Sequence, residues 1–164
     1  MHIQKIICGG QTGIDRMAIE VARVLNIPTG GTAAKGFMTE NGPDYTLIDF
    51  GLKEHTIGGY PPRTRQNVLD AEGTVMYGDI NSTGTRLTKQ YCIQFSRPYI
   101  ENPTPEQLDN FLGEYVIQTL NVAGNRASKM TQQHLEEYRQ LFRASLEYHL
   151  QKAMHNQKGQ SRRL

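Results

Sequence analysis

A glycine-rich segment with polar side chains follows the first apolar run of the chain, where residues 8–16 read CGGQTGIDR. Glycine allows a backbone to approach a ligand closely, and amide groups at a helix start carry positive potential, so this composition suits an anion. Asp15 could bond a ribose hydroxyl or simply favour the helix dipole in a first turn. Because the spacing matches neither the GxxxxGKS/T nor the GxGxxG phosphate-binding pattern, a plain tight turn is the alternative for the segment alone.

Three more polar, glycine-containing segments follow predicted strands. They read GGTAAKG at residues 30–36, GDINSTGTR at 78–86 and NVAGNRAS at 121–128. The carboxyl ends of parallel strands share one edge of a sheet, where ligands bind. We therefore expect all four segments to meet at one edge and to offer two phosphate-sized sites, as a nucleotide or a diphosphate requires.

Basic side chains near these segments supply the charge that a phosphate needs. Arginine is suited to forked contacts with phosphate oxygens, and the candidates are Arg16, Lys35, Arg86 and Arg126. The segment PPRTRQNV at 61–68 adds two arginines at a predicted helix start, where the helix dipole disfavours cations. An anion or an acidic neighbour would explain them, and solvation at the surface is the alternative.

Strand and helix patterns alternate along the chain. The predicted strands cover 3–8, 27–29, 74–77, 98–100 and 116–122, and the predicted helices cover 14–25, 64–71, 84–95 and 105–112. Residues 31–61 are weakly periodic and are predicted to be loops with a short strand near Ile48. Such alternation favours an α/β fold, with a mostly parallel sheet between two layers of helices.

The C-terminal part of the sequence predicts a long amphipathic helix. Thr131 can cap it, and its apolar stripe comprises Leu135, Tyr138, Phe142, Leu146 and Leu150. We divide the chain into a domain at 1–128, this helix at 129–155 and a basic flexible tail at 156–164. The helix packs either on the domain itself or on a partner subunit, which would make the protein a homo-oligomer.

Composition excludes several classes of protein. The 164 residues suit one domain, and no apolar run approaches the ~20 residues that span a bilayer. No charged segment followed by an apolar signal core is present at the start, so we expect a cytoplasmic location without membrane contact. The net charge of +2 does not favour nucleic acid. Cys8 and Cys92 are expected to be buried thiols, and no metal-ligand spacing occurs.

Five segments in this order resemble the family described as "putative molybdenum carrier". They are CGGQTGIDRMAIEVARVLNIPTGG, AKG, RTRQNVLDAEGTVMY, STGTRLT and LNVAGNRAS, within residues 3–128. That family is similar to the SLOG and lysine-decarboxylase-like superfamily of nucleotide-binding domains. The resemblance implies a Rossmann-like domain that binds a nucleotide or a pterin-type phosphate. The chain departs from the family at Ala34 and Asn125, where proline is frequent.

The residues that we predict to bind the ligand come from the four segments and from the arginine-containing helix start. They are Gly9, Gly10, Gln11, Thr12, Gly13, Asp15, Arg16, Gly30, Gly31, Lys35, Gly36, Arg63, Thr64, Asn67, Ser82, Thr83, Gly84, Thr85, Asn121, Gly124 and Arg126. The related phosphoribohydrolases have a catalytic glutamate where this chain has Thr88, which is no acid or base at neutral pH. No catalytic residue is therefore predicted.

Three functions follow as alternatives. The first is a binding protein, a carrier, sensor or sequestering protein, for a phosphate-bearing small molecule such as the molybdenum cofactor or an ADP-ribose-type nucleotide. The second is a nucleotide hydrolase that uses Asp15 or Asp70, with Asp79 and Glu101 as further carboxylates on other loops. The third is an assembly module that works through its C-terminal helix.

Overall fold

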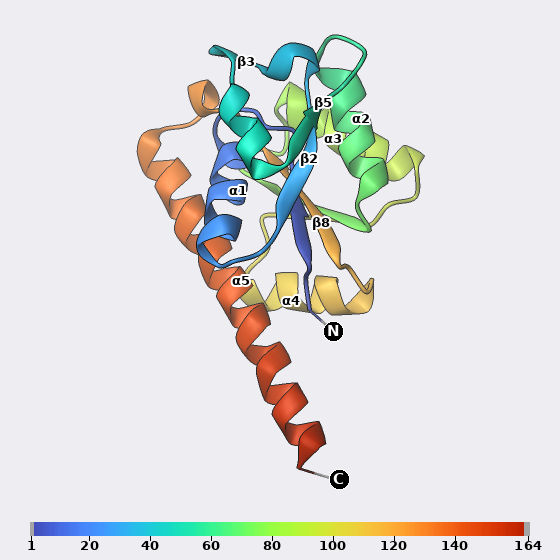
Figure 1. The fold of residues 1–164 in the computed structure, drawn as a ribbon, viewed down its shortest axis with the longest axis vertical. Coiled ribbons are helices and arrows are strands. Elements are labelled where there is room, and N and C mark those ends of the chain that lie inside the picture. Colours follow the sequence, from blue (N-terminus) through green and yellow to red (C-terminus); the bar gives the residue numbers. More distant parts are fainter. Residues whose placement is uncertain (1, 163–164) are drawn as a thin grey trace.

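The computed structural model describes residues 2–162 and has a six-stranded parallel sheet at its centre (Figure 1). The strands are β1 (Lys5–Ile7), β2 (Thr29–Ala33), β5 (Leu52–Glu54), β6 (Gly73–Tyr77), β7 (Tyr99–Glu101) and β8 (Thr119–Gly124). Their order in the sheet is β5-β2-β1-β8-β6-β7, and all neighbours are parallel. The predicted α/β, Rossmann-like class is confirmed.

Helices cover both faces of this sheet. The helices α1 (Ile14–Val24), α4 (Pro105–Glu114) and α5 (Gln132–Ser161) pack against one another on one face, and α2 (Tyr60–Asp70) and α3 (Thr83–Gln94) pack together on the other (Figure 1). The main core lies under the first group. It is built from fully buried side chains such as Ile14 of α1, Leu108 of α4, Phe142 of α5 and Leu120 of β8.

The strand order creates a crevice at one edge of the sheet. The chain runs from β1 outward to β2 and β5, then crosses to β6 and β7, and β8 returns between β1 and β6. The loop after β1 leads to α1 on one face, whereas the loop after β6 leads to α3 on the other. In open parallel sheets, ligands bind at such a reversal, outside the carboxyl ends of the strands.

Residues 34–59 have more structure than the predicted loops. They contain β3 (Met38–Thr39) and β4 (Gly42–Pro43), which form a short hairpin, two 3-10 helices at Lys35–Phe37 and Tyr45–Phe50, and β5. The strand predicted near Ile48 is wrong, because Ile48 belongs to the second 3-10 helix. That helix and β5 bury Leu47, Phe50 and Leu52 in a second apolar cluster with Ile19 of α1.

Gly30 and Gly31 lie within β2 rather than in a loop after it. The predicted strand at 27–29 therefore begins and ends too early. Gly31 has φ +119°, and a Cβ on it would lie 2.2 Å from the carbonyl oxygen of Cys8, the residue directly after β1. A side chain at this position would collide with the neighbouring backbone, so the glycine serves the close approach of two strands.

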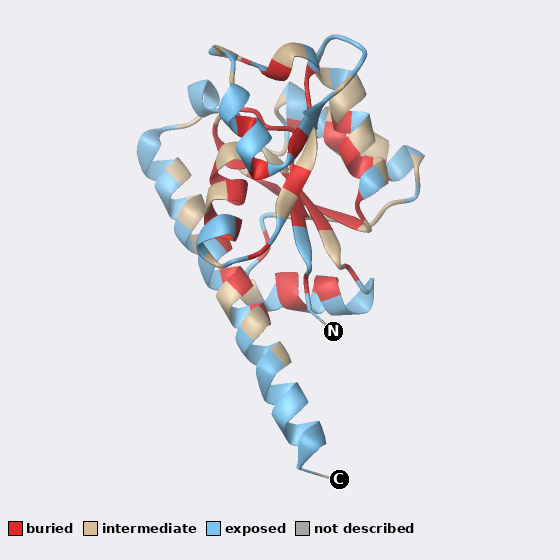
Figure 2. Cartoon of the chain, viewed as in Figure 1, coloured by how far each residue is buried: buried red, intermediate tan, exposed pale blue. Residues whose placement is uncertain are grey.

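The long C-terminal helix packs on its own domain. Thr131 caps it as predicted, since its hydroxyl accepts a hydrogen bond from the His134 amide at 3.1 Å. Phe142 and Leu146 are fully buried, and the Phe142 ring lies edge-on to Tyr77 of β6 with centroids 5.8 Å apart. The helix continues to Ser161, past the predicted boundary at residue 155, and its last turns project from the domain (Figure 2).

A buried polar cluster fixes α5 to α4 and to the start of the chain. The Ile3 amide donates to His149 Nε2 at 3.1 Å, which requires the hydrogen of a neutral ring to sit on Nδ1. Nδ1 then donates to Asp109 Oδ1 at 2.8 Å. Lys152 donates to the other oxygen of Asp109 at 2.6 Å. One buried carboxylate thus joins two helices.

We expect Asp109 to make the protein less stable at acid pH than at neutral pH. Burial alone would raise the pKa of Asp109, but hydrogen bonds from Lys152 and His149 lower it overall. A pKa below the unfolded value of ~3.9 contributes stability above that value, which is lost as the pH falls through the folded pKa. Asp109→Asn should therefore lower the free energy of unfolding at pH 7 by about 1.5–3 kcal/mol.

Urea denaturation of both proteins at neutral and acid pH measures this effect. The difference between wild type and Asp109→Asn should shrink as the pH falls below about 4, because the wild-type carboxylate is then protonated. Asp70→Asn is the matched control, since Asp70 is exposed and, within the described part of the chain, accepts a hydrogen bond from Gln66 alone. A difference that stays constant down to acid pH would contradict the role given to Asp109.

Candidate functional site

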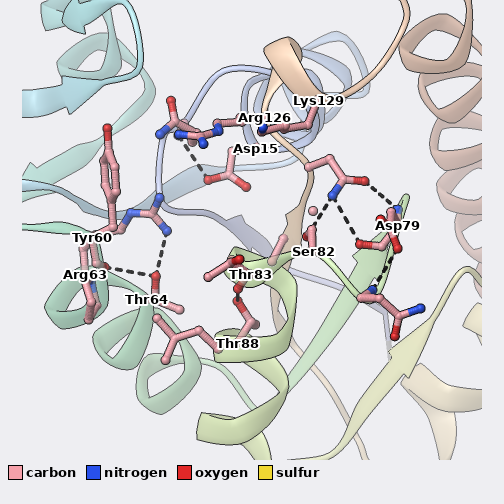
Figure 3. A pocket seen from close by; sticks show the side chains of 18 residues that line it. Asp15, Tyr60, Arg63, Thr64, Asp79, Ser82, Thr83, Thr88, Arg126 and Lys129 are labelled. Carbon is pink, nitrogen blue, oxygen red and sulfur yellow. Dashed lines mark hydrogen bonds between the residues drawn. The ribbon is translucent and has the colours of Figure 1, made fainter.

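A cavity of about 660 Å³ opens at the carboxyl ends of β1, β6 and β8, where the strand order reverses (Figure 3). Its volume falls within the ~300–1,000 Å³ of small-molecule sites. The walls come from the segment after β1, the start of α2, the loop after β6 with the first turns of α3, and the loop after β8.

The cavity brings together predicted residues from three of the four glycine-containing segments and from the helix start of α2. They are Gln11, Asp15, Arg63, Thr64, Ser82, Thr83, Gly84, Gly124 and Arg126. The segment at 30–36 contributes none, because its first glycines lie within β2 and Lys35 is exposed on the first 3-10 helix.

The segment after β1 uses its own polar groups inside the protein. The Gln11 amide donates to Asp15 Oδ2 at 3.1 Å, and the Thr12 amide donates to Gln11 Oε1 at 3.0 Å. The Thr12 hydroxyl donates to Glu40 Oε2 at 2.6 Å, which ties the segment to the β3–β4 hairpin. It is therefore a turn that presents Gln11 and Asp15 to the cavity, and not an exposed cradle of amides.

The glycines of this segment are needed for packing. Gly10 has φ +75° and lies against Leu47, whereas a Cβ on Gly13 would lie 2.4 Å from the Asn125 carbonyl oxygen. Gly9 lies under the guanidinium of Arg63, because a Cβ there would be 2.5 Å from Nη1. These three glycines do not line the cavity, and neither does Thr12.

Arg16 lies away from the cavity and pairs with the protein's own oxygens. Its guanidinium donates to Glu20 at 3.1 Å, to Asp44 at 3.2 Å and to the Thr46 hydroxyl at 2.7 Å, and it also lies over the Phe50 ring. It thereby fastens the second 3-10 helix to α1. The structure gives Arg16 an architectural role.

Three more predicted residues support the site from behind. Asn67 of α2 pairs with the backbone of Thr32, accepting from its amide and donating to its carbonyl at 2.8 Å each. Asn121 of β8 donates to the Thr74 hydroxyl of β6 at 3.2 Å. Thr85 is buried, and its hydroxyl oxygen accepts a hydrogen bond from the Ser82 hydroxyl at 2.9 Å. The bonds of Asn67 and Asn121 each fix one element beside another, whereas the bond between Ser82 and Thr85 lies within the first turn of α3.

Arg63 has hydrogen-bond donors that the protein does not use. Its Nε is buried and has no partner among residues 2–162, while Nη1 donates to the Thr64 hydroxyl at 2.9 Å. The guanidinium also lies near the Tyr60 ring, 5.3 Å from its centroid. Arg63 lines the cavity, so its guanidinium is placed to donate to an oxygen supplied by a ligand.

The start of α3 offers backbone donors at the same cavity. Ser82 caps the helix by accepting from the Thr85 amide at 3.4 Å. The amides of Thr83 and Gly84 find no acceptor within the described chain. First-turn amides with the positive end of a helix dipole bind anions, so this end of α3 suits a phosphate.

Asp15 is a buried carboxyl group in the cavity wall. Burial raises its pKa, and the Arg63 guanidinium and the amides of Gln11 and Gly9 lower it by less, so that the pKa lies above its ordinary value. Only 4% of the residue is exposed. The cavity therefore combines donors for an anion with two acidic residues, Asp15 and Asp79, of which Asp15 is the buried one.

Asn125 joins the two loops that border the cavity. Its side-chain oxygen accepts from the Asp79 amide, and its Nδ2 donates to the Ser82 hydroxyl at 2.9 Å. Gly78, with φ +99°, leaves room for this amide. Asn125 is the residue that replaces a frequent proline, and a lone asparagine gave no sign of this role. It orients the loop that carries Arg126 and Lys129 to the cavity.

The other carboxylates considered for hydrolysis lie in different places. Asp79 lines the cavity, whereas Asp70 does not, and Glu101 pairs with Lys89 at 2.9 Å.

Among residues 2–162 no group of three or more His, Cys, Asp or Glu side chains could hold a metal ion. Cys8 and Cys92 are free, buried thiols, and burial raises the pKa of Cys92 to about 11. No described helix is both long and apolar enough to cross a membrane.

Comparisons with known proteins agree with this architecture. Residues 6–145 match the family described as "Circularly permutated YpsA SLOG family". The chain is similar to the crystal structure of a "putative molybdenum carrier protein" from Syntrophus aciditrophicus, with 34% identity, a TM-score of 0.76 and coverage of 91% of this chain and 96% of that one. Both findings support a ligand-binding role in general terms.

A further solved structure is only distantly similar to this chain. A reductase acting on (E)-1-hydroxy-2-methyl-but-2-enyl 4-diphosphate from Plasmodium falciparum is 12% identical, with a TM-score of 0.33 and coverage of 84% of this chain and 51% of that one. A search of curated proteins found no match. The family match covers most of the chain, and so this protein belongs to the circularly permuted YpsA family of SLOG domains.

Proposed function

We propose that this protein binds a phosphate-bearing, nucleotide-like small molecule in the cavity at the carboxyl ends of β1, β6 and β8. The observation that carries the proposal is the set of donors around one space: the guanidinium of Arg63, which lines the cavity, and the amides of Thr83 and Gly84, for which residues 2–162 provide no acceptor. Arg126 and Lys129 add positive charge at the same cavity. A phosphate group has enough acceptor oxygens to satisfy all of these donors.

The ligand would be an ADP-ribose-type nucleotide or the molybdenum cofactor. The name of the structural relative from S. aciditrophicus, a molybdenum carrier, supports the second, and both ligands carry the phosphate that the donors require. The protein would hold this ligand as a carrier, a sensor or a sequestering protein in the cytoplasm. Thr88 cannot replace a catalytic glutamate, because a hydroxyl is no acid or base at neutral pH, and it donates to the Gly84 carbonyl at 3.1 Å.

Hydrolysis of the ligand is a second candidate, favoured by one observation. Asp15 is a buried carboxyl group in the cavity with a raised pKa, and such groups act as general acids. Incubating the protein with nucleotides and separating the mixture by chromatography distinguishes the two functions. Ligand recovered unchanged from the complex supports binding, whereas a released base or phosphate supports hydrolysis.

Thermal denaturation with a panel of compounds tests the binding proposal. The panel contains AMP, ADP-ribose, a pterin phosphate and inorganic phosphate, with adenosine as the control without phosphate. A ligand present at 100 times its Kd stabilises the folded state by about 2.7 kcal/mol, which raises the Tm by several degrees in a chain of this size. An unchanged Tm with every phosphate compound would overturn the proposal.

A further inference from the structure

The walls of the cavity differ in chemistry. The start of α3 and Arg63 present unused donors, while Asp15 presents a carboxyl group on another side (Figure 3). Tyr60 and Leu87 add apolar surface. A ligand that is complementary to this cavity needs an anionic group for the donors, a flat apolar ring for the apolar surface and a hydrogen-bond donor for the carboxyl group.

The carboxyl group of Asp15 is held in place but is not neutralised by an ion pair. Gln11 donates its amide to Oδ2 at 3.1 Å, and Asp15 belongs to the first turn of α1. The guanidinium of Arg63 lies near enough to lower the pKa of Asp15, yet within residues 2–162 the two form no ion pair. Asp15 therefore has a fixed position and keeps acceptor capacity for a further donor.

A second phosphate does not suit this wall. A phosphate beside a buried carboxylate would suffer like-charge repulsion in a medium of low dielectric constant. The nearest amides, those of Gln11 and Thr12, already donate within the protein. We therefore expect one phosphate site instead of two, formed by the free donors at the start of α3 and by Arg63.

We propose that Asp15 is a specificity-determining residue that accepts a hydrogen bond from a sugar hydroxyl of the ligand. The ligand is then a phosphate ester of a ribose-type sugar, with its phosphate at the start of α3, its ring against Tyr60 and Leu87, and its sugar hydroxyls at Asp15. A hydroxyl rather than a ring N–H fits this position, because the apolar wall for the ring is provided by other residues. This assignment rests on the proposed function.

Calorimetric titration with AMP and 2′,3′-dideoxy-AMP tests the assignment. Wild type should bind AMP more tightly than the dideoxy compound by about ten-fold or more, the value of a hydrogen bond to a charged group. In Asp15→Asn the preference should fall to less than about three-fold, because a neutral amide forms a weaker bond. The affinity for inorganic phosphate should be unchanged or higher, since repulsion is removed.

Two further variants separate this role from general damage. Glu20→Gln removes a carboxylate from the same helix outside the cavity, where Glu20 pairs with Arg16, and should keep the full preference for AMP. Arg63→Gln should weaken both nucleotides by the same factor and keep the preference. A Tm for each variant shows whether it is folded.

Each outcome has one meaning. Equal binding of AMP and 2′,3′-dideoxy-AMP to wild type overturns the assignment of Asp15 and leaves the proposed function standing. A preference that survives in Asp15→Asn also overturns it. Binding of neither nucleotide, with no response to inorganic phosphate, overturns the proposed function itself. The comparison in wild type decides the matter even if Asp15→Asn does not fold.

Discussion

Arg63→Gln should weaken the binding of a phosphate ligand by about 1.5–3 kcal/mol, or roughly ten- to a hundred-fold in Kd. The reason is that Arg63 lines the cavity and its side chain makes one hydrogen bond among residues 2–162, from Nη1 to Thr64, so its guanidinium keeps donors for a ligand. Glutamine retains polarity but not the charge or the forked donors that a phosphate prefers. Calorimetric titration of both proteins with the best compound of the panel gives the ratio of Kd values.

Arg65→Gln is the matched control for this change. Arg65 lies two residues along the same helix and is exposed, and its guanidinium stacks on the Phe95 ring at 4.9 Å from the centroid, away from the cavity. The two variants change the net charge equally, so a purely long-range effect of charge would appear in both. Equal losses in Arg63→Gln and Arg65→Gln would contradict a direct contact between Arg63 and the phosphate.

Phe142→Ala should lower the free energy of unfolding by about 3–5 kcal/mol, the usual cost of removing a fully buried phenylalanine. Phe142 has no exposed surface and packs on Tyr77 of the central sheet. Urea denaturation measures the change. Met154→Ala on the projecting part of α5 is the control and should alter stability by less than about 0.5 kcal/mol, because Met154 is exposed.

This prediction bears on the role of the C-terminal helix. If α5 served only to join subunits, Phe142→Ala would change the oligomeric state and leave the stability of the domain unchanged, which would contradict the packing described above. Because α5 covers the core, removing residues 131–164 would expose that core. Self-association through the projecting end is better tested by size-exclusion chromatography of a chain that lacks residues 156–164.

Much of the fold could be predicted from local patterns. Apolar residues at helical spacing in α1 and α5, the β-rich run of β6 and the capping residue Thr131 each act over a few neighbouring positions. Alternation of these elements then favours a parallel sheet. Because such signals depend only on neighbouring residues, they can be recognised in the sequence without knowing the rest of the fold.

Residues 31–61 were predicted poorly because their structure depends on distant contacts. Strand β5 has three residues, of which only Leu52 is buried, so it shows no periodic pattern. Gly31 is a poor strand residue by propensity, and a glycine is needed there because the backbone of Cys8, directly after β1, lies close to it. Neither fact can be recognised from the segment itself.

The sequence indicated where a candidate cavity would lie better than it indicated which hydrogen-bond donors would remain unused there. Strand ends and glycine-containing segments indicated one edge of the sheet, and Arg63, Ser82 and Arg126 line a cavity at that edge. The sequence did not show that Thr12 bonds Glu40, which lies 28 residues away, and that the first segment is thereby used internally. Hydrogen bonds between distant loops decide which donors remain for a ligand.

The most direct test of the account is a crystal structure of the protein with a bound nucleotide monophosphate. The account predicts phosphate oxygens within hydrogen-bonding distance, about 2.7–3.2 Å, of the Arg63 guanidinium and of the amides of Thr83 and Gly84. A nucleotide seated elsewhere at saturating concentration, or one whose phosphate faces solvent and makes no contact with the Arg63 guanidinium, would contradict it.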